Sequence, residues 1–179
     1  MSSSNTEKEV RLLGIKPDEM KIVLKNNNAQ FLGKLNFKRI IFDTIPVQKE
    51  AWVRLRSDGK QTTLTYKKII NDSVDGTEEV EIMVDNLETT QELLEKCGLV
   101  SRNYQENTRE LYTWMGCEIA IDLWPQLEPH MEIESDSVEK VQQCAEAFQG
   151  MYKDLTTKSI DELYRAKGID VKTIASLKF

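Results

Sequence analysis

Apolar and polar residues alternate through the segment Ala51–Lys67, and this alternation predicts a β-hairpin. The sequence SDGK at positions 57–60 separates the two alternating runs and has the composition of a tight turn. Since side chains on a strand repeat with a period of two, the apolar residues fall on one face of the hairpin. The other face presents three cations: Arg54, Arg56 and Lys67.

The same pattern predicts six further strands and four helices. The strands are expected at Glu7–Leu13, Phe31–Asp43, Glu78–Asp85, Tyr104–Trp114, Cys117–Asp122 and Met131–Glu134. Three amphipathic helices are expected at Pro17–Lys25, Leu87–Cys97 and Ser137–Phe148, and a shorter helix at Ile160–Lys167. Strands and helices mixed in this order indicate an α+β fold.

Full charges occupy one face of strand after strand, opposite Val, Leu or Ile. For the hairpin alone, a solvent-exposed polar face would explain this. Repeated carboxylate pairs at i and i+2 need more explanation, because like charges at that spacing repel unless a cation lies between them. If the strands form a barrel, the charges either face outward around an apolar interior or line a polar interior that helices cover from outside. The second arrangement would hold a polyphosphate, with Arg and Lys on some walls and Mg²⁺ or Mn²⁺ on the carboxylates.

Composition narrows the class of protein. A chain of 179 residues fits one domain, and a net charge of −6 argues against a general nucleic-acid role. Three widely spaced cysteines predict reduced thiols and a cytoplasmic protein, and one histidine, His130, argues against a His-based triad. We find no apolar run of membrane-spanning length, and we expect Met1–Thr6 to be a disordered polar leader.

Several motifs occur in one order along the chain: EKEVR at 7–11, WVRLRSDGKQTTLTYK at 52–67, GTEEVEIMVDNLETTQELLEKCGL at 76–99, YQENTRELY at 104–112 and IDLWPQLEPHMEIES at 121–135. Together they resemble the CYTH superfamily, which is named for class IV adenylate cyclase and thiamine triphosphatase and whose members are also called triphosphate tunnel metalloenzymes. Each motif is weak by itself, but their order is specific, and the resemblance covers nearly the whole chain.

The resemblance implies one domain over residues 1–179, with a C-terminal helical tail at 151–179. It implies a closed eight-stranded antiparallel β-barrel, with helices packed outside, that binds a triphosphate with Mg²⁺ or Mn²⁺. The implied substrate-binding residues are Arg11, Arg54, Arg56, Lys67 and Arg109. The implied metal ligands are Glu7, Glu9, Asp122, Glu132 and Glu134. The implied catalytic residues are Glu7, Glu9, Arg11 and Glu81. Glu79 matches a second acidic residue that the family has on its fifth strand.

Two positions depart from the family pattern. Arg11 replaces the signature lysine. This replacement keeps the charge but removes a proton donor that could act at neutral pH. Asn107 stands where the family usually has a lysine, and the missing cation is expected to weaken phosphate binding or to alter substrate choice. For His130 we expect a structural role near the tunnel mouth.

The leading hypothesis is a metal-dependent triphosphatase acting on inorganic triphosphate, a nucleoside triphosphate or thiamine triphosphate. A class IV adenylate cyclase would use the same phosphate and metal residues. A protein that binds polyphosphate or nucleotide without catalysis is a third hypothesis, and a barrel without a ligand is a fourth. The expected partner is a small molecule containing a triphosphate, with no nucleic acid and no membrane, and the chain is expected to be a monomer or a homodimer.

Overall fold

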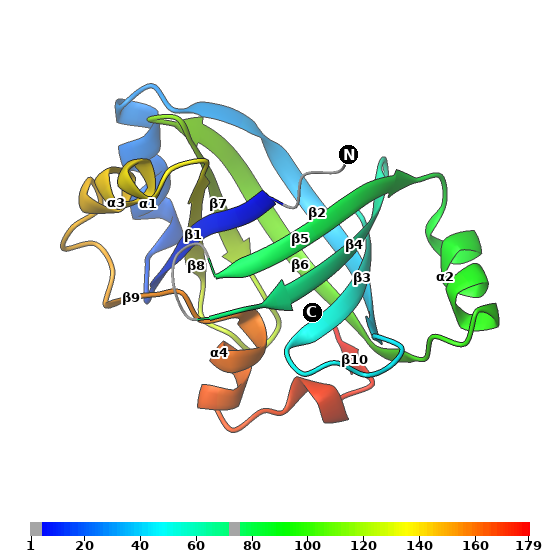
Figure 1. Ribbon diagram of the computed structural model, residues 1–179. Coiled ribbons are helices and arrows are strands. Elements are labelled where there is room, and N and C mark those ends of the chain that lie inside the picture. The colour runs from blue at the N-terminus through cyan, green and yellow to red at the C-terminus, as the bar shows by residue number, and fades with distance from the viewer. Residues whose placement is uncertain (1–4, 72–75) are drawn as a thin grey trace.

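A computed structural model describes residues 5–71 and 76–179, and it shows an α+β fold in which helices flank a curled sheet (Figure 1). The sequence Asp75-Gly76 predicts a turn at 71–77, and part of that turn lies outside the described residues. The strands are β1 (Asn5–Leu13), β2 (Gln30–Asp43), β3 (Ala51–Ser57), β4 (Thr62–Ile69), β5 (Thr77–Val84), β6 (Ser101–Trp114), β7 (Cys117–Leu123), β8 (His130–Ser135), β9 (Asp154–Thr156) and β10 (Ser176–Leu177). The helices are α1 (Pro17–Asn26), α2 (Leu87–Lys96), α3 (Val138–Glu146) and α4 (Ile160–Ala166), with a 3₁₀ turn at Val171–Thr173.

The predicted hairpin is confirmed as β3 and β4, which pair antiparallel from Ala51↔Lys68 to Ser57↔Thr62. Its turn is stabilised by Asp58, whose carboxylate accepts hydrogen bonds from the backbone N–H groups of Lys60 and Gln61, both at 2.8 Å. Gly59 adopts a φ of +90°, which an L side chain would strain. The turn therefore fixes the register that places the hairpin cations.

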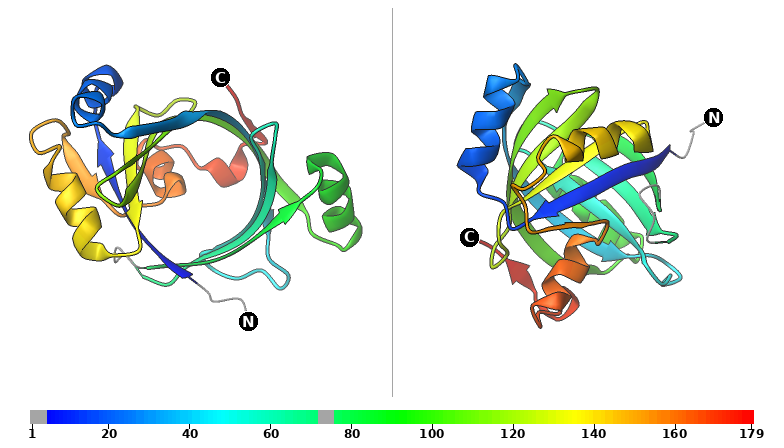
Figure 2. Two further views of the ribbon diagram at one scale, coloured as in Figure 1. Left: turned by 90° about the horizontal axis from the view of Figure 1, so that it is seen from above. Right: turned by 90° about the vertical axis from the view of Figure 1, so that its left-hand side faces the viewer.

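The prediction of a closed eight-stranded antiparallel barrel is corrected in two respects. Within the described ranges the sheet has ten strands, in the order β10-β6-β2-β3-β4-β5-β1-β8-β7, with β9 paired to β1 and a further ladder between β6 and β7. The two added strands are short C-terminal segments, and β10 pairs with β6 in parallel. In addition, β1 pairs with β5 only over residues 5–7 and then with β8 from Lys8 onward. The sheet is therefore curled around a central space (Figure 2).

Helices cover the outer face of the sheet only in part. Met20 and Leu24 of α1 and Val141 of α3 are fully buried in the main apolar core, which they share with the outer faces of β1, β7 and β8. α2 stands apart from this core (Figure 2) and contributes partly buried leucines to a smaller cluster built on β2 and β3. On β5, Val80 and Ile82 remain exposed. The expected helical cover is therefore confirmed over β1, β7 and β8 but not over β5.

The C-terminal segment contains the expected helix α4 but also β9, β10 and the 3₁₀ turn, so it is less helical than expected. Tyr164 and Val171 are buried with Trp124 and Leu177 in an apolar cluster of their own, and the Tyr164 hydroxyl donates a 2.6 Å hydrogen bond to the carbonyl of Pro125. These contacts attach the segment below the sheet (Figure 1).

At the N-terminus, β1 begins at Asn5, inside the stretch expected to be a leader, and residues 1–4 lie outside the described part. None of the helices in the described ranges combines the length and the apolar character that crossing a membrane requires.

Candidate functional site

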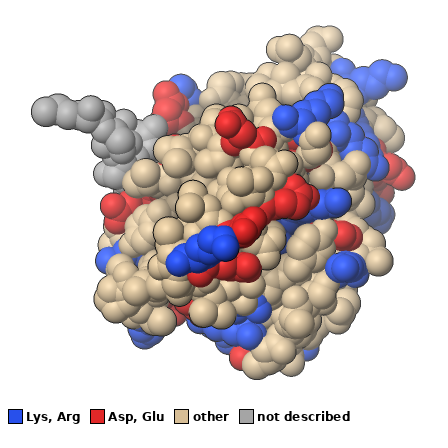
Figure 3. Space-filling model, turned by 90° about the vertical axis from the view of Figure 1, so that its right-hand side faces the viewer, with Lys and Arg blue, Asp and Glu red and all other residues tan. Residues whose placement is uncertain are grey.

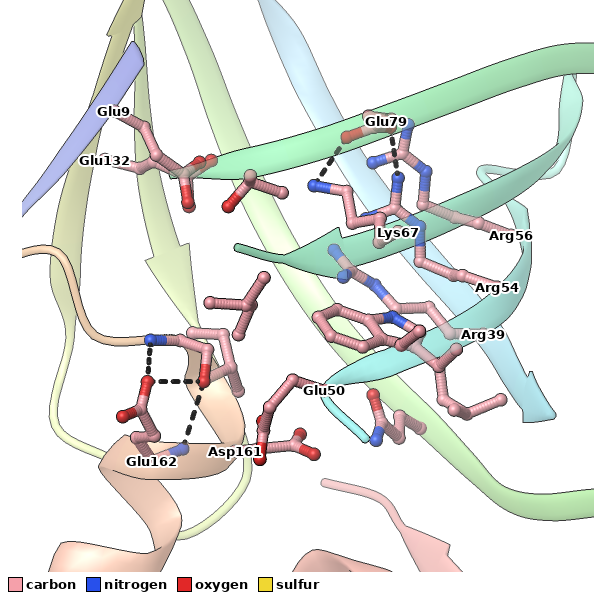
Figure 4. Close-up of a pocket in the computed structure, with 18 of the residues that line it drawn as sticks. Glu9, Arg39, Glu50, Arg54, Arg56, Lys67, Glu79, Glu132, Asp161 and Glu162 are labelled. Atoms are coloured by element: carbon pink, nitrogen blue, oxygen red, sulfur yellow. Dashed lines mark hydrogen bonds and ion pairs between the residues drawn. The ribbon is translucent and has the colours of Figure 1, made fainter. Parts of the chain in front are cut away.

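A cavity of about 430 Å³ lies inside the curled sheet, and charged side chains from most of the strands line it (Figure 4). Arg11 and Arg54 are less than 10% exposed, although both carry full charges. The charged strand faces therefore line a polar interior, which is the second of the two arrangements that the sequence left open. Figure 4 shows Glu9 and Glu132 on one side of the cavity and Lys67, Arg54 and Arg56 on the other.

The basic side, which we call the basic wall, comprises Arg39, Arg54, Arg56 and Lys67. The pairing of β3, β4 and β5 aligns Arg54 with Thr65 and Thr65 with Glu81. In this row the Thr65 hydroxyl donates a 2.6 Å hydrogen bond to Glu81 Oε2, and Arg54 Nη2 lies 3.4 Å from the same oxygen. Cross-strand register thus brings a cation and a carboxylate together from strands that are not neighbours.

The next row of the basic wall pairs Lys67 with Glu79. Lys67 Nζ lies 2.6 Å from Glu79 Oε2, and Arg54 Nη2 lies 3.3 Å from Glu79 Oε1. Burial, and next the charge of Arg54, lower the pKa of Arg56 to about 10. The carboxylates therefore offset only part of the repulsion among the cations of this wall.

On the opposite side, three carboxylates form a group that we call the carboxylate cluster: Glu9, Glu132 and Glu134. Glu9 of β1 lies directly opposite Glu134 of β8 in the ladder. One oxygen from each member lies within 4.8 Å of the other two. Like charges directly opposite each other destabilise a sheet, and three convergent carboxylate oxygens suit a hard divalent cation. The donor set therefore fits Mg²⁺ or Mn²⁺.

Arg11 lies next to this cluster and connects it to the C-terminal segment. Its Nη2 donates to Glu132 Oε2 at 2.7 Å and to Glu9 Oε1 at 2.9 Å, and its Nη1 donates to the carbonyl oxygen of Lys158 at 2.8 Å. Burial acts against the charged form, but Glu9 and Glu132 outweigh it and raise the pKa of Arg11 above its ordinary value.

Arg109 forms the most extensive ion pair of the site. Its Nε and Nη2 bind Asp122 at 2.9 and 2.7 Å, and Nη2 also lies 2.9 Å from Glu132 Oε1. Asp122 is 1% exposed and accepts a further 3.3 Å hydrogen bond from Asn107. Burial opposes ionisation of Glu132, but Arg109, Arg11 and Lys67 hold its pKa well below the usual range.

The structure brings most of the residues that the sequence singled out to this cavity: Glu9, Arg11, Arg54, Arg56, Lys67, Glu81, Arg109, Asp122, Glu132 and Glu134 all line it. Asp122 stands outside the carboxylate cluster, and both its oxygens bind Arg109. Glu7 belongs to β1, but its side chain lies outside the described residues. His130 is buried, with Nε2 at 3.9 Å from Asp122 Oδ2.

Sequence reasoning missed Arg39, which lies on β2 and belongs to the basic wall. The signal was present, because a period of two places Arg39 on the same face as Ile41 and Asp43, and all three line the cavity. It was also weak, since the run FKRIIFD reads as an apolar strand with charges near its ends. Trp124, in the loop after β7, also lines the cavity.

Glu81 gives the protein a testable dependence on pH. Burial raises its pKa, but the Thr65 hydroxyl and the charges of Arg56 and Arg54 outweigh burial and lower the pKa below the usual value. Such a carboxyl stabilises the fold above its unfolded pKa of about 4.3, and this stability is lost as the pH falls through the folded pKa. Since Glu81 is 35% exposed, we expect Glu81→Gln to cost only roughly 0.5–1 kcal/mol at neutral pH.

Urea unfolding of the wild type and Glu81→Gln at neutral pH and at about pH 3 measures this difference. We expect the two proteins to converge at the lower pH. An equal difference at both pH values would contradict an electrostatic origin.

On the outer surface shown in Figure 3, basic and acidic side chains are interspersed, and neither sign covers the face. Charges of one sign gather instead inside the cavity, on its separate walls (Figure 4).

Several proteins of known structure share this fold. The model of the CYTH domain family matches residues 5–166. Among solved structures, the PH1012 protein from Pyrococcus horikoshii OT3 superposes with a TM-score of 0.75 at 19% identity, over 88% of this chain and 98% of that one. The PH1819 protein from the same organism superposes with a TM-score of 0.69 at 24% identity, over 89% of this chain and 99% of that one. HpAC1 from Hippeastrum, a protein with a dominant triphosphatase activity, superposes with a TM-score of 0.65 at 19% identity, over 90% of this chain and 95% of that one. No curated protein sequence matches the chain.

Proposed function

The chain belongs to the CYTH family, and from that premise we propose that it is a divalent-metal-dependent triphosphatase whose substrate lies inside the cavity. The observation that carries the proposal is the opposition of the basic wall to the carboxylate cluster across one cavity. A triphosphate with its cation needs both surfaces, because the phosphate oxygens require donors and the cation requires oxygen ligands. We further propose that the chain works as one domain and that the curled sheet encloses the tunnel.

Glu9, Glu132 and Glu134 would hold the metal. Their oxygens converge within 4.8 Å, and carboxylates are the ligands that Mg²⁺ and Mn²⁺ prefer. When bound, the ion would neutralise charge at the phosphate oxygens and assist activation of a water molecule.

The basic wall would bind and orient the phosphates. Arg54 and Arg56 project side by side from one strand, and each guanidinium can bind phosphate oxygens through two parallel N–H groups. Lys67 adds a compact charge from the neighbouring strand. Because these groups are fixed before substrate arrives, they can stabilise charge that develops as the terminal P–O bond breaks.

Arg11 and Arg109 would act as positioning residues. Both bind Glu132, from opposite oxygens, at 2.7 and 2.9 Å. A ligand carboxylate held at both oxygens keeps one orientation, which keeps the metal site and the basic wall in a fixed relation. Glu81 would hold Arg54 and Arg56 toward the cavity.

A class IV adenylate cyclase is the second candidate. Trp52, Val47 and Ile160 also line the cavity, and these side chains could pack against the base of ATP. In that reaction the 3′-hydroxyl attacks the α-phosphorus and pyrophosphate leaves, and the basic wall would bind the leaving group.

The test is one assay on three substrates. Orthophosphate, pyrophosphate and cyclic AMP would be measured from inorganic triphosphate, ATP and thiamine triphosphate, each with Mg²⁺ or Mn²⁺ and with EDTA as the control. We expect metal-dependent orthophosphate release. Cyclic AMP with pyrophosphate from ATP would establish the cyclase instead. Absence of turnover, with triphosphate still raising Tm, would indicate a binding protein.

A further inference from the structure

We propose that Arg39 is a phosphate-binding residue of this cavity and that it binds the anion without first leaving an ion pair. The inference rests on the proposed function, because it names a residue of the same site. Arg39 lies on β2 and is 7% exposed, and Figure 4 shows its guanidinium turned into the cavity, beneath Arg54 and Lys67.

The first observation is that Arg39 forms no ion pair with the described residues. It makes no hydrogen bond or ion pair with any of them, and its buried Nε has no partner. A buried charge without a partner is costly, so proteins rarely keep one that serves only the fold. An anion in the cavity would supply the missing acceptors.

The second observation is how Arg39 is held. Its guanidinium carbon lies 4.7 Å from the ring centre of Trp124 and 5.3 Å from that of Phe37. Contact with a ring face fixes the plane of the guanidinium but uses few of its N–H donors. Arg39 is therefore positioned while its donors remain available to a ligand.

The third observation is the charge around it. Burial, and next the charges of Arg54, Arg56 and Arg109, hold the pKa of Arg39 well below its ordinary value. Asp122 acts in the opposite direction and does not compensate. The burial and the neighbouring cations thus disfavour the charge of Arg39, and a polyphosphate anion would relieve the repulsion.

Three other cations of the cavity differ in this respect. Lys67 is bound to Glu79 at 2.6 Å, Arg11 to Glu132 at 2.7 Å and Arg109 to Asp122 at 2.7 Å. Each must share or leave a carboxylate to bind a phosphate. Arg39 and Phe37 lie on β2, which pairs with β6. The β6 residue opposite Phe37 is Asn107, which carries no charge. Arg39 therefore supplies a cation close to the neutral Asn107 in the ladder of β2 and β6.

The experiment compares Arg39→Met with Lys38→Met. Lys38 is the next residue on the same strand and is exposed outside the cavity, so its variant removes the same charge without changing the site. Binding of inorganic tripolyphosphate would be measured by calorimetry in EDTA, well below the Tm of each protein. We expect Arg39→Met to weaken binding about 10- to 100-fold, the range for charge-assisted hydrogen bonds, and Lys38→Met to leave it unchanged.

A second measurement separates binding from a structural role. If Arg39 binds anions, Arg39→Met should raise the Tm of the ligand-free protein, because a buried unpaired charge is removed, and Arg39→Lys should recover part of the lost affinity. If Arg39 serves only the fold, Arg39→Met should lower the Tm and leave the affinity unchanged. Unchanged affinity overturns the proposal whichever way the Tm moves.

Turnover distinguishes this proposal from the proposed function. A wild type that binds tripolyphosphate but hydrolyses none, with weaker binding in Arg39→Met, would support the role of Arg39 and reject the triphosphatase. If the wild type hydrolyses triphosphate and Arg39→Met has the same dissociation constant and KM, the result would support the triphosphatase and reject the role of Arg39. A wild type that binds no tripolyphosphate overturns both.

Discussion

Arg109→Ala is expected to lower the free energy of unfolding by about 3–5 kcal/mol, the cost of removing one partner from a buried ion pair. Arg109 holds Asp122 through two parallel hydrogen bonds and also binds Glu132. Asp122 is 1% exposed, so water cannot replace the lost guanidinium. The variant would leave the buried Asp122 without this cation, whereas Glu132 would keep its ion pair with Arg11. Urea unfolding at neutral pH measures the loss.

Lys21→Ala is the control for Arg109→Ala. Lys21 Nζ forms a 2.9 Å ion pair with Glu110, the residue next to Arg109, but on the outside and with the lysine 34% exposed. An exposed pair of this kind contributes little, and we expect a loss of less than about 1 kcal/mol. Equal losses in the two variants would mean that the Arg109 pair is as well solvated as the surface pair.

The second large effect is expected from Glu9→Gln/Glu134→Gln. This pair of substitutions removes two of the three convergent carboxylates but keeps the size of both side chains. We expect Mn²⁺ binding to weaken at least about tenfold, because affinity for hard cations follows the number of charged oxygen ligands. Since a bound metal supplies several kcal/mol of charge stabilisation, the rate of triphosphate hydrolysis should fall about 100-fold or more.

The matched control is Glu92→Gln/Glu95→Gln, which makes the same change of charge on α2. Both of its carboxylates are exposed. Calorimetry with Mn²⁺ and the orthophosphate assay would be run on both double variants. If Mn²⁺ affinity and turnover stay at the wild-type level in Glu9→Gln/Glu134→Gln, the carboxylate cluster is a row of sheet residues and not a metal site.

These expectations share one physical basis. The cavity concentrates both signs of charge, and Arg11, Lys67 and Arg109 are each paired with a carboxylate. A triphosphate with its cation would exchange these pairs for contacts of the phosphates with the basic wall and of the metal with the carboxylate cluster. Arg39 differs from these three cations in this exchange, because its contacts are aromatic.

The sequence was a reliable guide to local structure and to residue type. Alternation predicted β3 and β4 within two residues at each end, and turn chemistry predicted their connection. The motif order predicted family membership, which the match over residues 5–166 confirms. Most of the cavity-lining residues were also predicted, because a period of two assigns each side chain to a face from the local sequence alone.

The tertiary structure decided what the local pattern cannot express, namely which strands are neighbours and in what register. It placed Glu9 opposite Glu134 and assigned Asp122 to Arg109 instead of to the carboxylate cluster. It paired β1 with β5 near its start and with β8 further on, and it added β9 and β10 to the predicted strands. It also brought Trp124, far along the chain, against Arg39. Periodicity is a property of one strand, whereas these contacts join residues distant in sequence, and the packing of the whole chain selects them.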